Sequence, residues 1–217
     1  IISNEGTMWT QILNILKEKV KEGIEVRIMY DDMGCIPYLP ENYPKYLESL
    51  NIKCVVFNKL KIYNGIFMNN RDHRKITVID GKIAYTGWLN FSDEYINKLS
   101  RFGYWKDNAI KLEGDSVWNL TVMFLTLWNS YHKEDDNYLK FKTPSNKTIE
   151  PNGYISCYGS VPLNGILEGE DVYLNIINKA INYVYITTPY LIIDTDMINA
   201  LILAVKRGVD VKIIIPG

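Results

Sequence analysis

His73 and Lys75 lie two residues apart in a short segment whose residue types could carry out chemistry on a phosphate. Asp80 follows after four more residues, and Gly87 and Asn90 come next at G-x-x-N spacing. Residues i and i+2 of an extended strand point to the same face, so an imidazole and an ammonium can converge on one anion. The segment therefore predicts nucleophilic attack on a phosphate group.

Two short runs rich in β-branched and aromatic residues flank Asp80–Gly81 within residues 75–86. An Asp-Gly pair between such runs favours a tight hairpin turn. Each motif residue also has an ordinary interpretation: Asp80 as a turn residue, Lys75 as a solvated strand lysine and His73 as a surface histidine. The combination favours function, because the chain has two histidines and one of them lies in this pattern.

The segment from Asn70 to Tyr95 resembles the phospholipase D superfamily, and within it the bacterial cardiolipin synthases. The resemblance implies an α/β fold, in which a mixed β-sheet is flanked by helices as an αβα sandwich. It also implies two similar halves that each contribute one H-x-K-x4-D motif to a shared site. Further stretches that carry the resemblance are Tyr30–Gly34, Phe57–Asn58, Tyr104–Asp107, Phe124 with Trp128, Thr187–Tyr190 and Arg207–Gly217.

The resemblance assigns roles to five residues. His73 would attack phosphorus and form a phosphohistidine, while Lys75 and Asn90 would hold the phosphate oxygens by charge and by an amide donor. Asp80 completes the catalytic motif and would support its strand. In this family a downstream acidic residue fixes the second ring nitrogen of the histidine, and Asp107 is the best match. A strand-start or cap aspartate is the open alternative for Asp107.

Trp88 departs from the family pattern, because many relatives have Ser or Gly after the glycine of G-x-x-N. An indole there could narrow the pocket, contact a lipid or turn outward, which leaves the acceptor open. His132 has no lysine two residues later, so we expect it to be structural or on the surface. The proton donor of the family is the histidine of a second motif. This sequence lacks that motif, so we expect the chain to be inactive by itself.

The composition limits the partners and cofactors. With 47% hydrophobic residues, the 217-residue chain can bury a sizeable core. The formal net charge of -1 argues against a general polyanion binder such as a nucleic-acid coat. Three widely spaced cysteines, Cys35, Cys54 and Cys157, indicate free thiols. No cluster of His, Asp and Cys shows metal-ligand spacing, so we expect no metal and no other cofactor.

Residues 21–29 and 206–214 form an internal repeat with an offset of 185 residues, from 208 minus 23. In each copy an amphipathic helix ends at a glycine, which supplies a left-handed cap, and an apolar strand follows. We interpret residues 1–145 as a first phospholipase D-like half without its first strand. Residues 146–217 then hold the end of a polar linker and the incomplete start of a second half.

The leading hypothesis is a phosphatidyltransferase of the cardiolipin synthase type. It moves a phosphatidyl group between two phosphatidylglycerol molecules through a phosphohistidine, giving cardiolipin and glycerol. The expected partners are phosphatidylglycerol, other anionic phospholipids and the membrane surface, without nucleic acid. The expected location is a bacterial cell membrane, with the catalytic part facing the cytoplasm. Enzymes of this kind carry membrane-spanning segments before the catalytic part, and we expect those segments outside residues 1–217.

Two alternatives remain open. A homodimer of one-motif chains would complete the site as a nuclease or phosphodiesterase, and it would be detected as a stable dimer that cleaves DNA without a metal. A degenerate domain would keep the fold only as an interaction module, although all four of His73, Lys75, Asp80 and Asn90 are present. For catalysis, a second phospholipase D half or a dimer partner must complete the site.

Overall fold

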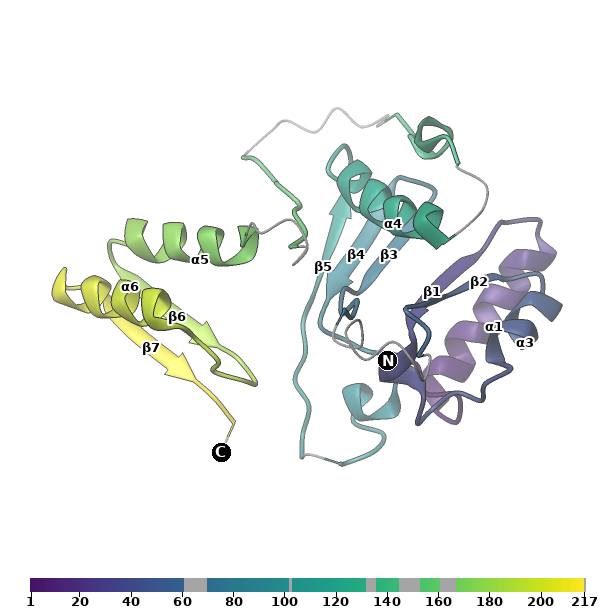
Figure 1. Cartoon of the computed structure of the whole chain (residues 1–217), viewed down its shortest axis with the longest axis horizontal. Helices are drawn as coiled ribbons and strands as arrows, with labels where there is room; N and C mark the ends of the chain where they lie inside the picture. The colour runs from purple at the N-terminus through teal and green to yellow at the C-terminus, as the bar shows by residue number, and fades with distance from the viewer. Residues whose placement is uncertain (61–69, 102, 132–135, 145–152, 161–166, 217) are drawn as a thin grey trace. The chain divides into compact units, whose positions relative to one another are not determined.

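The computed structural model describes residues 1–60, 70–101, 103–131, 136–144, 153–160 and 167–216. Its chain divides into two units, Ile1–Ser156 and Cys157–Gly217. Both units combine helices with strands (Figure 1), which confirms the predicted α/β class. The division predicted at 145/146 and His132 both lie outside the described residues. Among the described helices, none has the length and apolar character needed to cross a bilayer.

The first unit starts with a helix and a strand, and a further helix packs with them in one hydrophobic core. Trp9 and Leu13 lie four residues apart on α1 and are both buried, as neighbours on one helix face. They meet Tyr30 of β1 and Leu47 of α3 in this core. The elements of the unit are α1 (Thr7–Lys21), β1 (Arg27–Asp31), α2 (Asp32–Cys35), α3 (Tyr43–Ser49), β2 (Lys53–Phe57), β3 (Ile76–Ile79), β4 (Ile83–Gly87), η2 (Asp93–Ile96), β5 (Ala109–Glu113), α4 (Val117–Tyr131) and η3 (Tyr138–Phe141).

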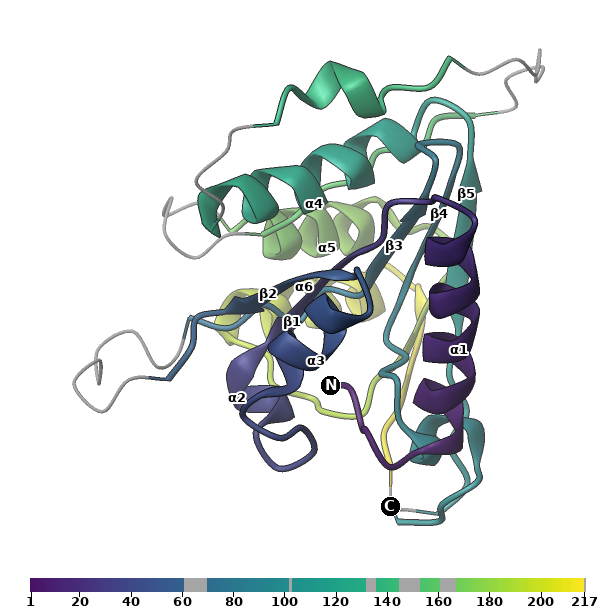
Figure 2. The ribbon, with the colours of Figure 1, turned by 90° about the vertical axis from the view of Figure 1, so that its right-hand side faces the viewer.

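The described strands of this unit form two sheets. β1 and β2 are parallel, whereas β3, β4 and β5 form an antiparallel sheet in that order. Asp80 and Gly81 have φ values of 54° and 64°, as a tight hairpin turn requires of its two central residues, and this confirms the predicted hairpin. Helix α4 crosses β3 and β4 and also contacts β2, so it links the two sheets (Figure 1 and Figure 2).

The register of the antiparallel sheet brings three chain segments to one end. Ile76 pairs with Thr86, and Gly87 pairs with Ala109. The start of β3, the end of β4 and the start of β5 therefore lie side by side. This places residues 73–75, which precede β3, at the same end of the sheet as the residues after β4 and before β5.

Gly87 is needed because β5 approaches it closely. A Cβ atom at Gly87 would lie 2.7 Å from the carbonyl oxygen of Asn108 and 3.0 Å from the Cα and Cβ atoms of Ala109. The glycine of the G-x-x-N pattern therefore allows β4 and β5 to pair right beside the segment that leads to Asn90.

The second unit repeats the helix-glycine-strand arrangement of the first. α6 (Thr195–Lys206) is followed by Gly208, with a φ of 86°, and by β7 (Asp210–Ile214), which pairs in parallel with β6 (Tyr183–Thr187). In the first unit, Gly23 follows α1 with a φ of 85°. The other helix of the second unit is α5 (Glu168–Lys179), and its Ile177 joins a core with Val184 and Ala204. The predicted elements of the repeat are therefore present in both units.

Replacing Gly87 by alanine should destabilise the first unit by about 1–3 kcal/mol, the usual cost of overpacking, because backbone atoms of β5 must move. Urea unfolding followed by circular dichroism measures the change. Gly34→Ala is the matched control, since a Cβ atom at Gly34 meets only ordinary contacts at 3.5 and 3.8 Å. Equal stability of the two variants would contradict the close-approach argument.

Candidate active site

The side chains of His73 and Lys75 meet just before β3. Nζ of Lys75 lies 3.0 Å from Nδ1 and 3.1 Å from Nε2 of His73, and it donates a hydrogen bond to the carbonyl oxygen of His73 at 2.8 Å. The imidazole stays exposed to solvent. An accessible imidazole beside an ammonium can bind an anion and attack it.

Burial and repulsion set the protonation states of the pair. Partial burial lowers the pKa of His73, and the positive charge of Lys75 lowers it further. Burial also lowers the pKa of Lys75 to about 8, against the opposing charges of Asp72 and Asp107. At neutral pH the ring is therefore uncharged and most of the amine is protonated. An uncharged imidazole has the lone pair that a nucleophile needs.

Trp88 covers one side of this pair. Its ring centroid lies 5.6 Å from that of His73, and Nζ of Lys75 lies 5.9 Å from the indole centroid, within reach of a cation–π contact. The indole is nevertheless 61% exposed. It thus narrows the approach to the candidate nucleophile and still presents an apolar surface to the outside.

Asn90 is buried and lies three residues after the end of β4. Its Oδ1 accepts a hydrogen bond from the backbone nitrogen of Ile1 at 2.9 Å, and its Nδ2 donates to the hydroxyl of Tyr95 at 2.5 Å. An amide nitrogen has two N–H groups, so one remains for another acceptor. Gly87 ends β4 at the same end of the sheet as residues 73–75, so Asn90 lies on the segment that leaves this end.

Asp107 lies close to Lys75. Its carboxylate accepts hydrogen bonds from Nε1 of Trp105 at 3.2 Å and from the backbone N–H of Asn108 at 2.7 Å, and its charge raises the pKa of Lys75. Within the described part of the chain, Asp107 makes no hydrogen bond to His73. The orienting role predicted for Asp107 therefore stays a prediction, and its hydrogen bonds are with the indole of Trp105 and the backbone of Asn108.

An aromatic pair connects Asn90 with Asp107. The ring of Trp105 packs edge-on against Tyr95 with centroids 4.6 Å apart. Tyr95 accepts the hydrogen bond from Asn90, and Trp105 donates to Asp107. One continuous set of contacts thus joins Asn90, the predicted phosphate-binding residue, to Asp107, the predicted orienting residue.

Asp80 lies in the hairpin turn, at the end of β3 away from Lys75. Its carbonyl oxygen accepts a hydrogen bond from Thr143 at 2.5 Å, and its side chain is exposed. Four strand residues span about 13 Å at ~3.3 Å each. The structure therefore does not bring the Asp80 carboxylate to His73 and Lys75, and its position is that of a residue that shapes the strand.

The carboxylate of Asp31 holds the segment that precedes His73. Its Oδ1 accepts hydrogen bonds from the backbone of Gly34 at 3.1 Å and from Nη1 of Arg71 at 3.2 Å. Its Oδ2 accepts one from the backbone of Asp72 at 3.0 Å. The side chains of Asp31 and Arg71 are only 13% and 20% exposed. One carboxylate at the end of β1 thus fixes the backbone just before the candidate nucleophile.

Sequence reasoning missed this role of Asp31. The contact joins residues 41 positions apart, so no local spacing shows it. The available signal was the place of Asp31 at the carboxyl end of an apolar strand, where parallel α/β sheets gather their functional side chains.

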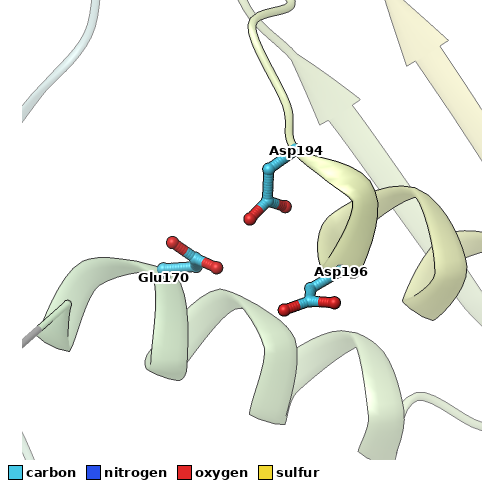
Figure 3. Close-up of side chains that lie close together, drawn as sticks. All are labelled: Glu170, Asp194 and Asp196. Atoms are coloured by element: carbon cyan, nitrogen blue, oxygen red, sulfur yellow. The ribbon is translucent and has the colours of Figure 1, made fainter.

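Three carboxylates gather in the second unit, as Figure 3 shows. One oxygen each of Glu170, Asp194 and Asp196 lies within 4.8 Å of the others. Asp194 also caps α6 by accepting a hydrogen bond from the backbone of Met197 at 2.9 Å. The hydrogen bond with Asp194, followed by burial and the charges of both aspartates, raises the pKa of Glu170. A proton shared between two of the carboxylates relieves the repulsion between their charges, so the cluster does not by itself indicate a metal.

Comparison with known proteins identifies the family. The sequence model described as "Cardiolipin synthase, PLD-like domain" matches residues 8–101 and 173–217, which is more than half of the chain. The chain belongs to this family. The resemblance found in the sequence motifs, to the cardiolipin synthase branch of the phospholipase D superfamily, is thus confirmed.

Three relatives show how far the similarity extends. An uncharacterized protein of Streptococcus mutans is 49% identical over 213 residues, which cover 98% of this chain and 46% of that protein. Cardiolipin synthase 1 of Staphylococcus aureus is 38% identical over 209 residues, 95% of this chain and 42% of that enzyme. A cardiolipin synthase of Alkalihalophilus pseudofirmus is 33% identical over 217 residues, 100% of this chain and 43% of that enzyme. The chain thus spans less than half the length of these relatives.

In this phospholipase D-like domain, Asp31→Asn should lower the free energy of unfolding by about 1.5–3 kcal/mol, the range for hydrogen bonds to charged groups, because Arg71 loses its counter-ion. The NMR signal of the His73 ring should shift as residues 70–72 loosen. Asp115→Asn, at an exposed aspartate before α4, is the control. An unchanged His73 signal in Asp31→Asn would show that Asp31 does not position the nucleophile.

Proposed function

We propose that this domain supplies the nucleophilic half of a phosphatidyltransferase site that acts on phosphatidylglycerol. The observation that carries the proposal is the ammonium of Lys75 within 3.0 and 3.1 Å of the two ring nitrogens of His73. Membership of the cardiolipin synthase family supports the choice of a phosphatidyl group as the group transferred. Two of the relatives carry the name cardiolipin synthase.

In the first step, one ring nitrogen of His73 attacks phosphorus with its lone pair. A nitrogen–phosphorus bond forms, and the bond between phosphorus and the oxygen of the glycerol headgroup breaks. Lys75 and the remaining N–H of Asn90 bind the non-bridging oxygens, which gain negative charge in the transition state. The departing glycerol oxygen takes a proton from an acid contributed by a second motif.

In the second step, the hydroxyl of another phosphatidylglycerol returns its proton to that acid, now a base, and attacks the phosphohistidine. The nitrogen–phosphorus bond breaks and His73 is regenerated. Two phosphatidylglycerol molecules are thereby converted to cardiolipin and glycerol. Because the donor and the acceptor are both anionic lipids, the working domain would lie at a membrane surface.

We also propose that residues 1–217 alone do not catalyse the phosphatidyl transfer. Among the described residues, no second imidazole lies beside His73. A second phospholipase D-like half, or a second copy of the chain, would contribute the proton donor.

The test of the nucleophile uses the protein expressed at full length from the coding region that contains this chain. His73→Gln should lower cardiolipin formation at least about a thousandfold, since loss of a covalent nucleophile removes a whole step. It should also abolish transfer of phosphate label from phosphatidylglycerol to the protein. His132→Gln replaces the only other histidine of the chain and should retain both activities. Phosphatidyl transfer retained by His73→Gln would refute the proposal.

The pH dependence of the same reaction tests the charge assignment. kcat/KM should rise with pH as His73 loses its proton, at or below its ordinary pKa of about 6.5, and should fall near pH 8 as Lys75 loses its own. Lys75→Arg should move the alkaline limb upward, because a guanidinium stays charged. Lys82→Arg, at an exposed turn lysine, is the control. An alkaline limb that stays in place in Lys75→Arg would contradict the assignment.

A further inference from the structure

The last residue of η2 and the loop from η2 to β5 expose large apolar side chains next to the candidate active site. Ile96, Leu99 and Tyr104 are 38%, 53% and 86% exposed. A single exposed apolar residue needs no explanation, whereas a group of them marks a contact surface. Figure 1 shows this loop at the end of the sheet where β4 ends and β5 begins.

The same loop is positively charged. Residues 96–106 contain Lys98, Arg101 and Lys106 and no acidic residue, although the net charge of the chain is -1. All three basic residues are exposed, and Arg101 also donates a hydrogen bond to the hydroxyl of Tyr38 at 3.0 Å. We call the six residues Ile96, Lys98, Leu99, Arg101, Tyr104 and Lys106 the rim patch.

Two hydrogen bonds between Asn97 and Trp105 hold the backbone of the loop that carries the rim patch. The side chain of Asn97 accepts a hydrogen bond from the N–H of Trp105 at 2.6 Å and donates one to its carbonyl oxygen at 2.8 Å. Asn97 itself has a φ of 57°, a left-handed conformation that Asn tolerates. The two ends of the loop are therefore tied together, while the side chains of Leu99 and Tyr104 between them are exposed.

The rim patch adjoins the site through residues already described. Trp105, which closes the loop, contacts Tyr95 and donates to Asp107. On the same end of the sheet, the exposed indole of Trp88 lies against His73 and Lys75. Apolar and basic groups thus border the candidate nucleophile.

We propose that the rim patch, together with Trp88, is the surface through which this domain rests on an anionic lipid bilayer. The inference builds on the proposed function, because it supplies the route by which a lipid phosphate reaches His73. The amphipathic rings of tyrosine and tryptophan suit the membrane interface. Basic side chains beside them are attracted to anionic headgroups. This charge complementarity selects a bilayer of phosphatidylglycerol over a neutral one.

Sedimentation with lipid vesicles tests the surface on residues 1–217. The chain should bind vesicles that contain phosphatidylglycerol more tightly than vesicles of phosphatidylcholine alone, and the preference should weaken at high salt. Lys98→Glu/Lys106→Glu should lower binding to the anionic vesicles by about tenfold or more, since each lysine near such a surface contributes to attraction. Leu99→Ser/Tyr104→Ser should lower binding to a similar degree, because the apolar insertion is lost.

Two double variants match these changes elsewhere in the first unit. Lys45→Glu/Lys82→Glu alters the net charge by the same amount at exposed lysines, and Leu139→Ser/Tyr154→Ser removes apolar groups that are more exposed than those of Leu99 and Tyr104. Both should bind vesicles like the unchanged chain. Equal losses in rim and control variants would overturn the inference, and so would a chain that does not prefer anionic vesicles.

The outcome is separable from that of the proposed function. One result is that the rim variants bind vesicles normally while the protein still forms phosphohistidine on His73 from dispersed short-chain phosphatidylglycerol. This result would refute the docking surface and support the proposed chemistry. If vesicle binding depends on the rim patch but the His73→Gln variant keeps transferase activity, the docking surface is supported and the proposed role of His73 is refuted.

Discussion

The site depends on two basic groups being held about one hydrogen bond apart. At 3.0 Å, two positive charges would repel strongly in a partly buried place, so only one of the two groups keeps its proton at neutral pH. The imidazole gives up its proton first, because its ordinary pKa is about four units below that of an amine. The same constraint therefore produces an uncharged nucleophile and a fixed positive charge beside it.

Two contacts away from the chemistry keep the pair in place. Asp31 holds the segment before His73 by accepting two hydrogen bonds, from Nη1 of Arg71 and from the backbone of Asp72, and Gly87 lets β4 pair closely with β5 beside the segment that carries Asn90. The contacts of Asp31 act on the segment that leads through His73 into β3, and Gly87 acts on the neighbouring strands β4 and β5. The stability of the first unit and the geometry of the site consequently share the same residues, since a shift of either strand end would move a reacting group.

Local patterns allowed much of the fold to be predicted. The hairpin at Asp80–Gly81 and the helix-glycine-strand units depend on residues next to one another in the chain, and the structure contains them. Helix α5 and strand β5 were not predicted, and neither was the role of Asp31. The partners of Asp107 also depend on the path of the loop before β5, which the ring contact of Trp105 with Tyr95 determines. Sequence spacing could suggest that Asp107 belongs to the site, but not which group it contacts there.

Under the proposed mechanism, the charges of His73 and Lys75 would supply only half of a catalytic site. Lys75 has a pKa of about 8, so it could in principle donate a proton to the departing glycerol oxygen. Once deprotonated, however, it could no longer neutralise the phosphate oxygens at the moment when their charge is largest. His73 cannot donate either, because its lone pair is bonding to phosphorus and its uncharged ring is a weak acid. One group cannot hold the phosphate and protonate the leaving group in the same step. The proposed reaction would therefore need a separate acid on the side of phosphorus opposite His73, since the attacking and leaving atoms of a displacement lie in line.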